Sequence, residues 1–315
     1  MNQFFENIKI ENFKSLRHVE LTDCKRINVF IGKPNVGKSN ILEALSVFSA
    51  TSKNGIDRAL LNKTIRYKHE VDIAFNGNVE NISHFVSNFA DFQLTFDLKD
   101  GMKLTSHIDK PDNASIKKYS FNFREKELVL QDDGNSLWCP YGQNLLDVLL
   151  QHSKLLAECQ TLFNAYRLQL FFDRNQRSLK IAKQTGKIGD YVPIIFSVDY
   201  GMIADTLQRI IFYKAAIASN KNSILLFEEP EAHSFPPYIV HITQEMIESK
   251  DNQFFLTTHS HFVLNDFLEN AREDLAVYLV DWQNDETVVK RLSSDDLHEI
   301  YQYGVDLFTN LETFI

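Results

Sequence analysis

The sequence has few cysteines, no long apolar run and no excess of basic charge. Its three cysteines, Cys24, Cys139 and Cys159, lack C-x-x-C spacing. This argues against a zinc site or a disulfide framework and is typical of a reducing compartment. No stretch approaches the roughly 18 apolar residues of a spanning helix, and the N-terminus lacks the features of a signal peptide. We therefore expect a cytoplasmic protein without a membrane partner.

The charge balance is acidic, with 42 acidic and 33 basic residues and a net charge of −9. Any contact with DNA would therefore need a local basic patch. One basic run consists of Arg174, Arg177, Lys180, Lys183 and Lys187. A DNA-contacting edge is one interpretation, and a solvated hairpin or helix face is the favoured one. The shorter cluster of Lys63, Arg66 and Lys68 is equally ambiguous.

A large core is expected, because 44% of the 315 residues are hydrophobic and 25 are phenylalanine. Residues 4–21 alternate like a strand pair. Short strands are predicted at 71–75, 92–98, 102–107, 119–123 and 127–131, which indicates an antiparallel sheet. Residues 143–172 have helical spacing. From 202 to 282 apolar strands alternate with helices, which predicts a parallel sheet covered on both faces.

The most specific motif is Gly32 to Ser39, which has the full G-x-x-x-x-G-K-[ST] form. It lies between a predicted buried strand at 26–31 and a predicted helix with an apolar face at 40–48. Such a loop surrounds phosphates with backbone N–H groups. We expect Lys38 to reach the β- and γ-phosphates and the Ser39 hydroxyl to ligate Mg²⁺. The predicted ATP-binding residues are Gly32, Lys33, Pro34, Asn35, Val36, Gly37, Lys38, Ser39 and Asn40.

Two carboxylates follow the apolar strand 223–227, at the strand end where ligands gather in parallel sheets. Glu228 is predicted to face Mg²⁺, and Glu229 to accept a proton from the attacking water. These residues could instead be a solvated helix start, but a nucleotide site needs such a partner.

A third motif, Thr257 to Ser260, stands at the end of the next apolar strand. Its imidazole, His259, is predicted to hydrogen-bond the γ-phosphate. A single histidine means little on its own, so this prediction depends on its position one strand after the paired carboxylates.

Together these motifs resemble the ABC-type ATPases of the RecF, SMC and OLD group, a branch of AAA-family, AAA_21-like ATPases. The resemblance rests on Ile8 to Leu16, the phosphate loop, Glu229 to His233 and Thr257 to Ser260. It implies a P-loop fold with a mixed or parallel central sheet flanked by helices, an antiparallel β subdomain and a helical subdomain. It also implies that Glu229 is the general base, His259 the switch histidine and 233–237 the loop facing a second protomer.

Two segments depart from the group pattern. Glu228 stands where the group has aspartate, and its extra methylene moves the metal-facing oxygen by about 1.5 Å. Slow hydrolysis is therefore expected unless a water bridges the gap. The signature segment is irregular: Ser197 and Gly201 are the candidates for a contact across a dimer, and an ordinary helix start is the alternative. For the glutamine loop, Gln93 and Gln131 both remain open.

The resemblance implies a single ATPase head over 1–315, with a nucleotide-binding lobe (1–135), a helical signature lobe (136–220) and the remaining core strands (221–315). The expected protein hydrolyses ATP with Mg²⁺ as an ATP-dependent homodimer. It would act in DNA repair or antiviral defence with an effector protein encoded nearby. No D-x-D pair follows His259, so we expect no fused TOPRIM nuclease. The alternative is a nucleotide-locked scaffold with little turnover; a small-molecule kinase is a distant third.

Overall fold

The structure is a computed structural model that describes residues 4–52, 55–97, 101–107, 115–121, 135–164, 166–188 and 192–314. Its contacts divide the chain into two compact units. The first unit consists of Met1–Tyr119, Asn222–Glu231 and Met246–Ile315, and the second of Ser120–Lys221 and Ala232–Glu245. Among the described helices, none combines the length and apolar character needed to cross a membrane.

The first unit is built on a six-stranded sheet with the order β16-β15-β3-β14-β13-β9. All neighbouring pairs are parallel except β15 with β16. The strands are β3 (Ile27–Ile31), β9 (Ser115–Tyr119), β13 (Ser223–Glu228), β14 (Gln253–Thr257), β15 (Leu275–Gln283) and β16 (Glu286–Arg291). Because β3, β14 and β13 are adjacent and parallel, their carboxyl ends meet at one edge, where ligands bind in such sheets.

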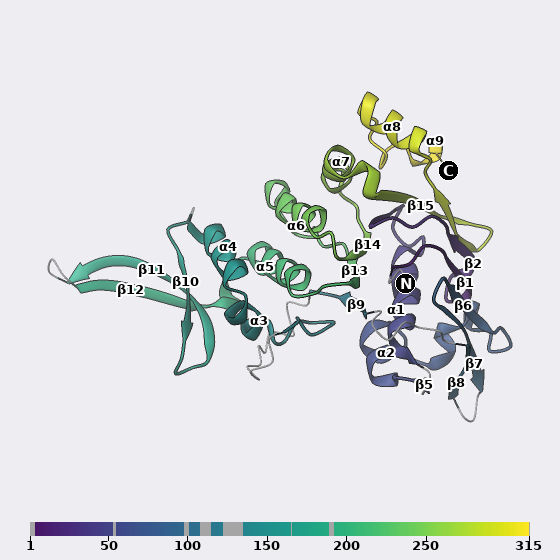
Figure 1. The fold of residues 1–315 in the computed structure, drawn as a ribbon, viewed down its shortest axis with the longest axis horizontal. Coiled ribbons are helices and arrows are strands. Elements are labelled where there is room, and N and C mark those ends of the chain that lie inside the picture. The colour runs from purple at the N-terminus through teal and green to yellow at the C-terminus, as the bar shows by residue number, and fades with distance from the viewer. Residues whose placement is uncertain are drawn as a thin grey trace. The chain divides into compact units, whose positions relative to one another are not determined.

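A second, antiparallel sheet in this unit has the order β2-β1-β6-β7-β8. Its strands are β1 (Ile8–Phe13), β2 (Leu16–Leu21), β6 (Ser83–Ser87), β7 (Ala90–Asp97) and β8 (Gly101–His107). Helix α1 (Lys38–Ala50) contacts both sheets, and Figure 1 shows it beside the antiparallel one. Phe48 on α1 packs edge-on against Phe5 and Phe92, with ring centroids 5.1 Å apart in both pairs. Each such buried ring stabilises the fold by about 1.5–3 kcal/mol.

The remaining elements of the first unit surround these sheets. They are the short pair β4 (Thr51–Ser52) and β5 (Gly55–Ile56), and the helices α2 (Arg58–Thr64), α7 (His261–Asn270), α8 (Ser294–Tyr303) and α9 (Leu311–Phe314). Helix α8 begins with a capping box in which the side chains of Ser293 and Asp296 accept each other's backbone N–H, and it ends at Gly304 in a left-handed conformation.

The second unit combines helices with a three-stranded antiparallel sheet, β10-β11-β12. Its strands are β10 (Gln169–Asp173), β11 (Ser178–Ile188) and β12 (Val192–Asp199), and its helices are α3 (Leu145–Gln151), α4 (Ser153–Asn164), α5 (Asp205–Ala218) and most of α6 (Pro236–Glu248). Strand β10 pairs only with the first half of β11, so the outer half of the β11–β12 hairpin extends beyond it (Figure 1).

The fold class predicted from the sequence is confirmed, and several local predictions are wrong. Residues 71–75 form 3-10 turns instead of a strand, because the Asp72 carboxylate accepts the backbone N–H groups of Lys68 and His69. The strand expected at 119–123 lies earlier and ends at Tyr119. The helical stretch 143–172 breaks at His152 and gives way to β10. The strand predicted at 127–131 lies outside the described residues.

Candidate nucleotide-binding site

The phosphate loop connects β3 to α1 as the sequence predicts. Gly37, immediately before α1, has φ of +102°, a conformation that favours glycine. A Cβ atom there would lie 2.1 Å from Thr287 Oγ1, and one on Gly32 would lie 2.1 Å from the Val280 carbonyl oxygen. Both glycines are therefore needed, because the loop packs directly on the β15–β16 hairpin.

Lys38 is folded back into its own loop. Its buried ammonium group donates hydrogen bonds to the carbonyl oxygens of Gly32 and Lys33, both at 2.8 Å. Burial lowers the pKa of Lys38, and the nearby carboxylates of Glu229 and Glu228 oppose that shift. The loop thus holds a cation between backbone oxygens, close to two acidic side chains.

Hydroxyl groups from distant segments of the chain hold the phosphate loop in place. Thr287 Oγ1 donates to the Val36 carbonyl oxygen at 2.9 Å and lies 2.7 Å from Ser15 Oγ. Ser15 Oγ also accepts a bond of 2.7 Å from the Asn40 side chain. Thr287 is buried, so this network connects the loop to β16 and to the turn between β1 and β2.

Ser39 and Glu228 meet although 189 residues separate them. The Ser39 hydroxyl donates to Glu228 Oε1, so the longer glutamate side chain reaches the serine predicted to ligate the metal. Glu228 is the last residue of β13, and Ser39 lies in the first turn of α1. The extra methylene of Glu228 therefore does not separate these two groups.

Glu229 and His259 form a second contact at the same sheet edge. His259 Nε2 lies 3.2 Å from Glu229 Oε1, and both side chains are partly exposed. Glu229 has φ of +43°, and its backbone N–H bonds to Thr257 at the end of β14. Burial, followed by the charge of Lys38, lowers the pKa of His259, with Glu229 acting in the opposite direction. This favours a neutral imidazole beside the carboxylate.

Glu231 holds the third motif in place. Its Oε1 atom accepts bonds from the Thr258 hydroxyl at 2.6 Å and the His259 backbone N–H at 3.0 Å. Its buried Oε2 atom has no hydrogen-bond partner among the described residues. Burial raises the pKa of Glu231, and the bond from Thr258 opposes this rise. The carboxyl group thus connects the segment after β13 to the segment after β14.

A cluster of charged residues surrounds the Ser39–Glu228 contact. Glu43 on α1 is fully buried and forms ion pairs with Lys14 and Arg66, whose Nε atom lies 2.6 Å from Glu43 Oε1. Lys118 on β9 is also buried, and its ammonium lies 3.9 Å from carboxylate oxygens of both Glu43 and Glu228. Burial lowers the pKa of Lys118, and these two carboxylates oppose the shift.

The oxygen set fits magnesium that arrives with phosphates. No group of three or more His, Cys, Asp and Glu side chains that could hold a metal occurs among the described residues. Magnesium is commonly bound by one or two protein oxygens together with waters and substrate phosphates. The Ser39 hydroxyl and the Glu228 carboxylate supply such a pair.

The other predicted site residues lie elsewhere. Ser197 is in β12, opposite Ala182, and Gly201 is in the 3-10 turn Tyr200–Met202 before α5. Both belong to the second unit. Gln93 is in β7 of the antiparallel sheet, and Gln131 lies outside the described residues.

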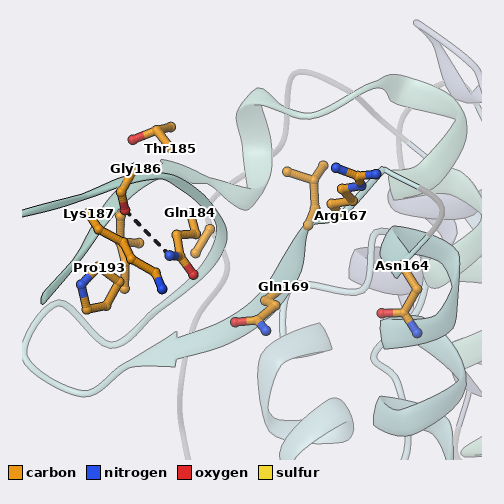
Figure 2. Close-up of a pocket in the computed structure, with 11 residues that line it drawn as sticks. Asn164, Arg167, Gln169, Gln184, Thr185, Gly186, Lys187 and Pro193 are labelled. Carbon is orange, nitrogen blue, oxygen red and sulfur yellow. Dashed lines mark hydrogen bonds between the residues drawn. The ribbon is translucent and has the colours of Figure 1, made fainter. Parts of the chain in front are cut away.

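The basic run forms a hairpin, one of the structures predicted for it. Arg174 and Arg177 lie in the β10–β11 turn, and Lys180 pairs with Asp173 at 3.1 Å. A hollow of about 850 Å³ opens beside β11 and β12 (Figure 2). Arg167 and Lys187 line it together with amide side chains such as those of Gln169 and Gln184, and the described residues that line it include no carboxylate.

Sequence reasoning missed the residues that support the site. Glu43, Lys118 and Thr287 approach the loop or its partners from three different segments. The sequence carries only weak signals of them: Glu43 lies in a predicted helix, on the side away from its apolar face, and Lys118 directly precedes a predicted strand. Neither indicates which partner the charge has.

Comparison with known proteins points to a family of ATPases. Residues 4–158 match the AAA ATPase domain family. The chain is similar to the DNA replication and repair protein RecF of Lactobacillus acidophilus, with 23% identity over 218 residues, which cover 65% of this chain and 52% of that protein. The chain therefore spans about half the length of this curated relative.

Two solved structures share the fold. A crystal structure of an Smc head bound to the C-winged helix domain of ScpA matches with a TM-score of 0.59 and 12% identity, covering 94% of this chain and 100% of that one. A structure of the recombination mediator protein RecF with ATPrS in the RecFOR pathway matches with a TM-score of 0.50 and 12% identity, covering 92% and 98%. At these identities the likeness shows the α/β architecture.

Proposed function

Because the chain is an ABC-type ATPase of the RecF/SMC group, we propose that it binds ATP with Mg²⁺ and hydrolyses it to ADP and phosphate. The observation that carries this proposal is the convergence of two contacts at one sheet edge: Ser39 with Glu228, and Glu229 with His259. Together with the loop Gly32–Asn40, they supply phosphate-binding groups, metal-facing oxygens and a proton acceptor.

Each residue then has a defined task. Lys38 exchanges its two carbonyl acceptors for phosphate oxygens and neutralises their charge. Ser39 and Glu228 hold magnesium, which supplies charge neutralisation at the β- and γ-phosphates when it is bound. Glu229 orients the attacking water and accepts its proton, while the neutral imidazole of His259 keeps that carboxylate directed toward the site.

Nucleotide binding is tested by titrating a fluorescent, non-hydrolysable ATP analogue into the wild type and Lys38→Ala. We expect affinity to fall at least about tenfold in the variant, because a buried charge-assisted contact is lost. Lys25→Ala is the matched control, since its ammonium pairs with Asp23 on the surface. Equal affinity in the wild type and Lys38→Ala would refute the proposed site.

We also propose that the chain is a single ATPase head, 1–315, that dimerises around ATP, with Ser197 and Gly201 of one copy completing the site of the other. The proposal is supported by the resemblance of the phosphate loop and of the motifs after β13 and β14 to the ABC-type group, although the signature segment itself departs from the group pattern. The mass of Glu229→Gln should double when ATP is added, because this variant retains the nucleotide. A monomeric mass with and without ATP would exclude the dimer.

A role in DNA repair or antiviral defence, with an effector protein, is the broader proposal. The name of the RecF relative supports a connection with DNA, and the hollow lined by Arg167 and Lys187 offers cations for phosphate contacts. ATP turnover measured with and without duplex DNA tests this part. If DNA neither binds nor changes turnover, the nucleic-acid role is wrong and a protein effector remains.

A further inference from the structure

Two cations contact the carboxylate of Glu228, and they differ in their freedom to move. Lys118 faces Oε2 and is 4% exposed, with its ammonium held by a 2.8 Å bond to the Thr64 carbonyl oxygen. Arg66 faces Oε1, with Nη2 at 3.3 Å, and its side chain is 65% exposed. Lys118 is therefore a fixed neighbour, whereas the guanidinium of Arg66 has solvent on one side.

Oε1 of Glu228 is the carboxylate oxygen that would bind magnesium together with Ser39. It accepts the hydrogen bond from Ser39, the residue that would share magnesium with it. Because Arg66 Nη2 lies beside the same oxygen, a protein cation already stands next to the metal-facing atom. A divalent cation and a guanidinium repel each other, so both cannot stay close to one carboxylate oxygen at low cost.

Arg66 can leave Glu228 without losing its place in the structure. Its Nε atom bonds to the buried Glu43 carboxylate at 2.6 Å, and its carbonyl oxygen accepts a bond of 2.6 Å from Lys14. Both anchors are independent of Glu228. Because the guanidinium is a rigid plane, a tilt of the whole group about the line from Nε to Glu43 Oε1 would move Nη2 away from Glu228 while keeping the Nε bond.

We propose that Arg66 holds the metal-facing oxygen of Glu228 before the nucleotide binds and swings away from it, while keeping its bond to Glu43, when magnesium binds. Arg66 is thus a positioning residue that keeps Glu228 pointed at Ser39 and competes with the metal. This inference rests on the proposed binding of nucleotide and magnesium. It adds that the Arg66 guanidinium raises the magnesium concentration at which the site fills.

The test is a comparison of nucleotide affinity with and without the metal. A fluorescent, non-hydrolysable ATP analogue is titrated in Mg²⁺ and in EDTA. The dissociation constant in EDTA divided by the dissociation constant in Mg²⁺ measures the contribution of the metal to affinity. In Arg66→Gln this ratio should rise by about threefold to tenfold over the wild type, because the competing charge is gone. The affinity in EDTA should change by less than about twofold.

Two further variants separate charge from packing. Arg66→Lys keeps a cation at the position and should retain a ratio near that of the wild type. Arg58→Gln makes the same chemical change on α2, where the side chain pairs with Glu70 at 3.1 Å, and should leave the ratio unchanged. Melting temperatures of all variants, measured without nucleotide, check that the fold is intact.

The outcomes are distinct from failure of the proposed function. If the wild type binds no nucleotide in Mg²⁺, the proposed function fails. If it binds and Arg66→Gln shows an unchanged or lower ratio, the competition by Arg66 is refuted. A loss of more than about tenfold in EDTA would also refute it, because Arg66 would then act on the nucleotide itself.

Discussion

The Glu231 carboxyl group supplies a hydrogen-bond acceptor and a buried charge, and measurements of stability at different pH values separate the effects of the two. Its Oε1 atom accepts bonds from the Thr258 hydroxyl and the His259 N–H, while Oε2 is buried without a partner in the part of the chain that the structure describes. Glu231→Ala removes the acceptor of the buried Thr258 hydroxyl and of the partly buried His259 N–H, so we expect the free energy of unfolding to fall by about 2–4 kcal/mol. Glu231→Gln keeps the accepting oxygen and removes the buried charge, so it should stay within about 1 kcal/mol of the wild type at pH 7.

The pH dependence follows from the raised pKa of Glu231, which burial causes. The folded chain favours the protonated carboxyl, whereas the unfolded chain ionises near the ordinary glutamate pKa of about 4.3. The stability that this group contributes is therefore lost as pH rises from about 4.3 through the raised pKa of Glu231 in the folded chain. The stability of Glu231→Gln relative to the wild type should consequently increase from pH 5 to pH 7.

Urea unfolding at several pH values measures both effects, with Glu231→Ala as the reference for a lost acceptor. The midpoint of each curve gives the stability difference, provided that the slopes agree. If Glu231→Gln is as unstable as Glu231→Ala at pH 7, or loses stability relative to the wild type as pH rises, the carboxylate is needed in its charged form and the reasoning is wrong.

Two more substitutions test the supports of the phosphate loop. Thr287→Val removes the hydroxyl that bonds to Val36; it should cost about 1–3 kcal/mol in urea unfolding and weaken nucleotide binding, and unchanged values of both would refute the bracing role. Lys118→Met removes a buried cation between Glu43 and Glu228; we expect a loss of about 2 kcal/mol or more in the same assay, and a more stable variant would contradict a structural role for that charge.

The parts of the site that the sequence predicts are local. Lys38 and Ser39 belong to one continuous motif whose spacing fixes the loop, and Glu228, Glu229 and His259 follow apolar strands that are recognisable by themselves. Because parallel strands end at a common edge, the pattern of strands and helices is enough to predict that these side chains meet. The predicted metal-facing pair, Ser39 and Glu228, is in contact.

The supporting residues could not be predicted, because their roles depend on contacts between distant segments. Arg66 follows α2, a helix that the sequence analysis did not predict, and its neighbour Glu228 lies far later in the sequence. Lys118 is in β9, which begins and ends a few residues earlier than its residue pattern predicts, so its position next to β13 was missed. Thr287 reaches Val36 across 251 positions.

The most direct test of the central claim is single-turnover hydrolysis of ATP in Mg²⁺ by the wild type and by Glu229→Gln. If Glu229 accepts the proton of the attacking water, the wild type should release phosphate, and the variant should bind ATP with similar affinity but react at least about 100-fold more slowly. Equal rates for the two proteins would contradict this role for Glu229. If the wild type shows no turnover, even with DNA present, the proposed ATPase activity is wrong and a nucleotide-locked scaffold is the better description.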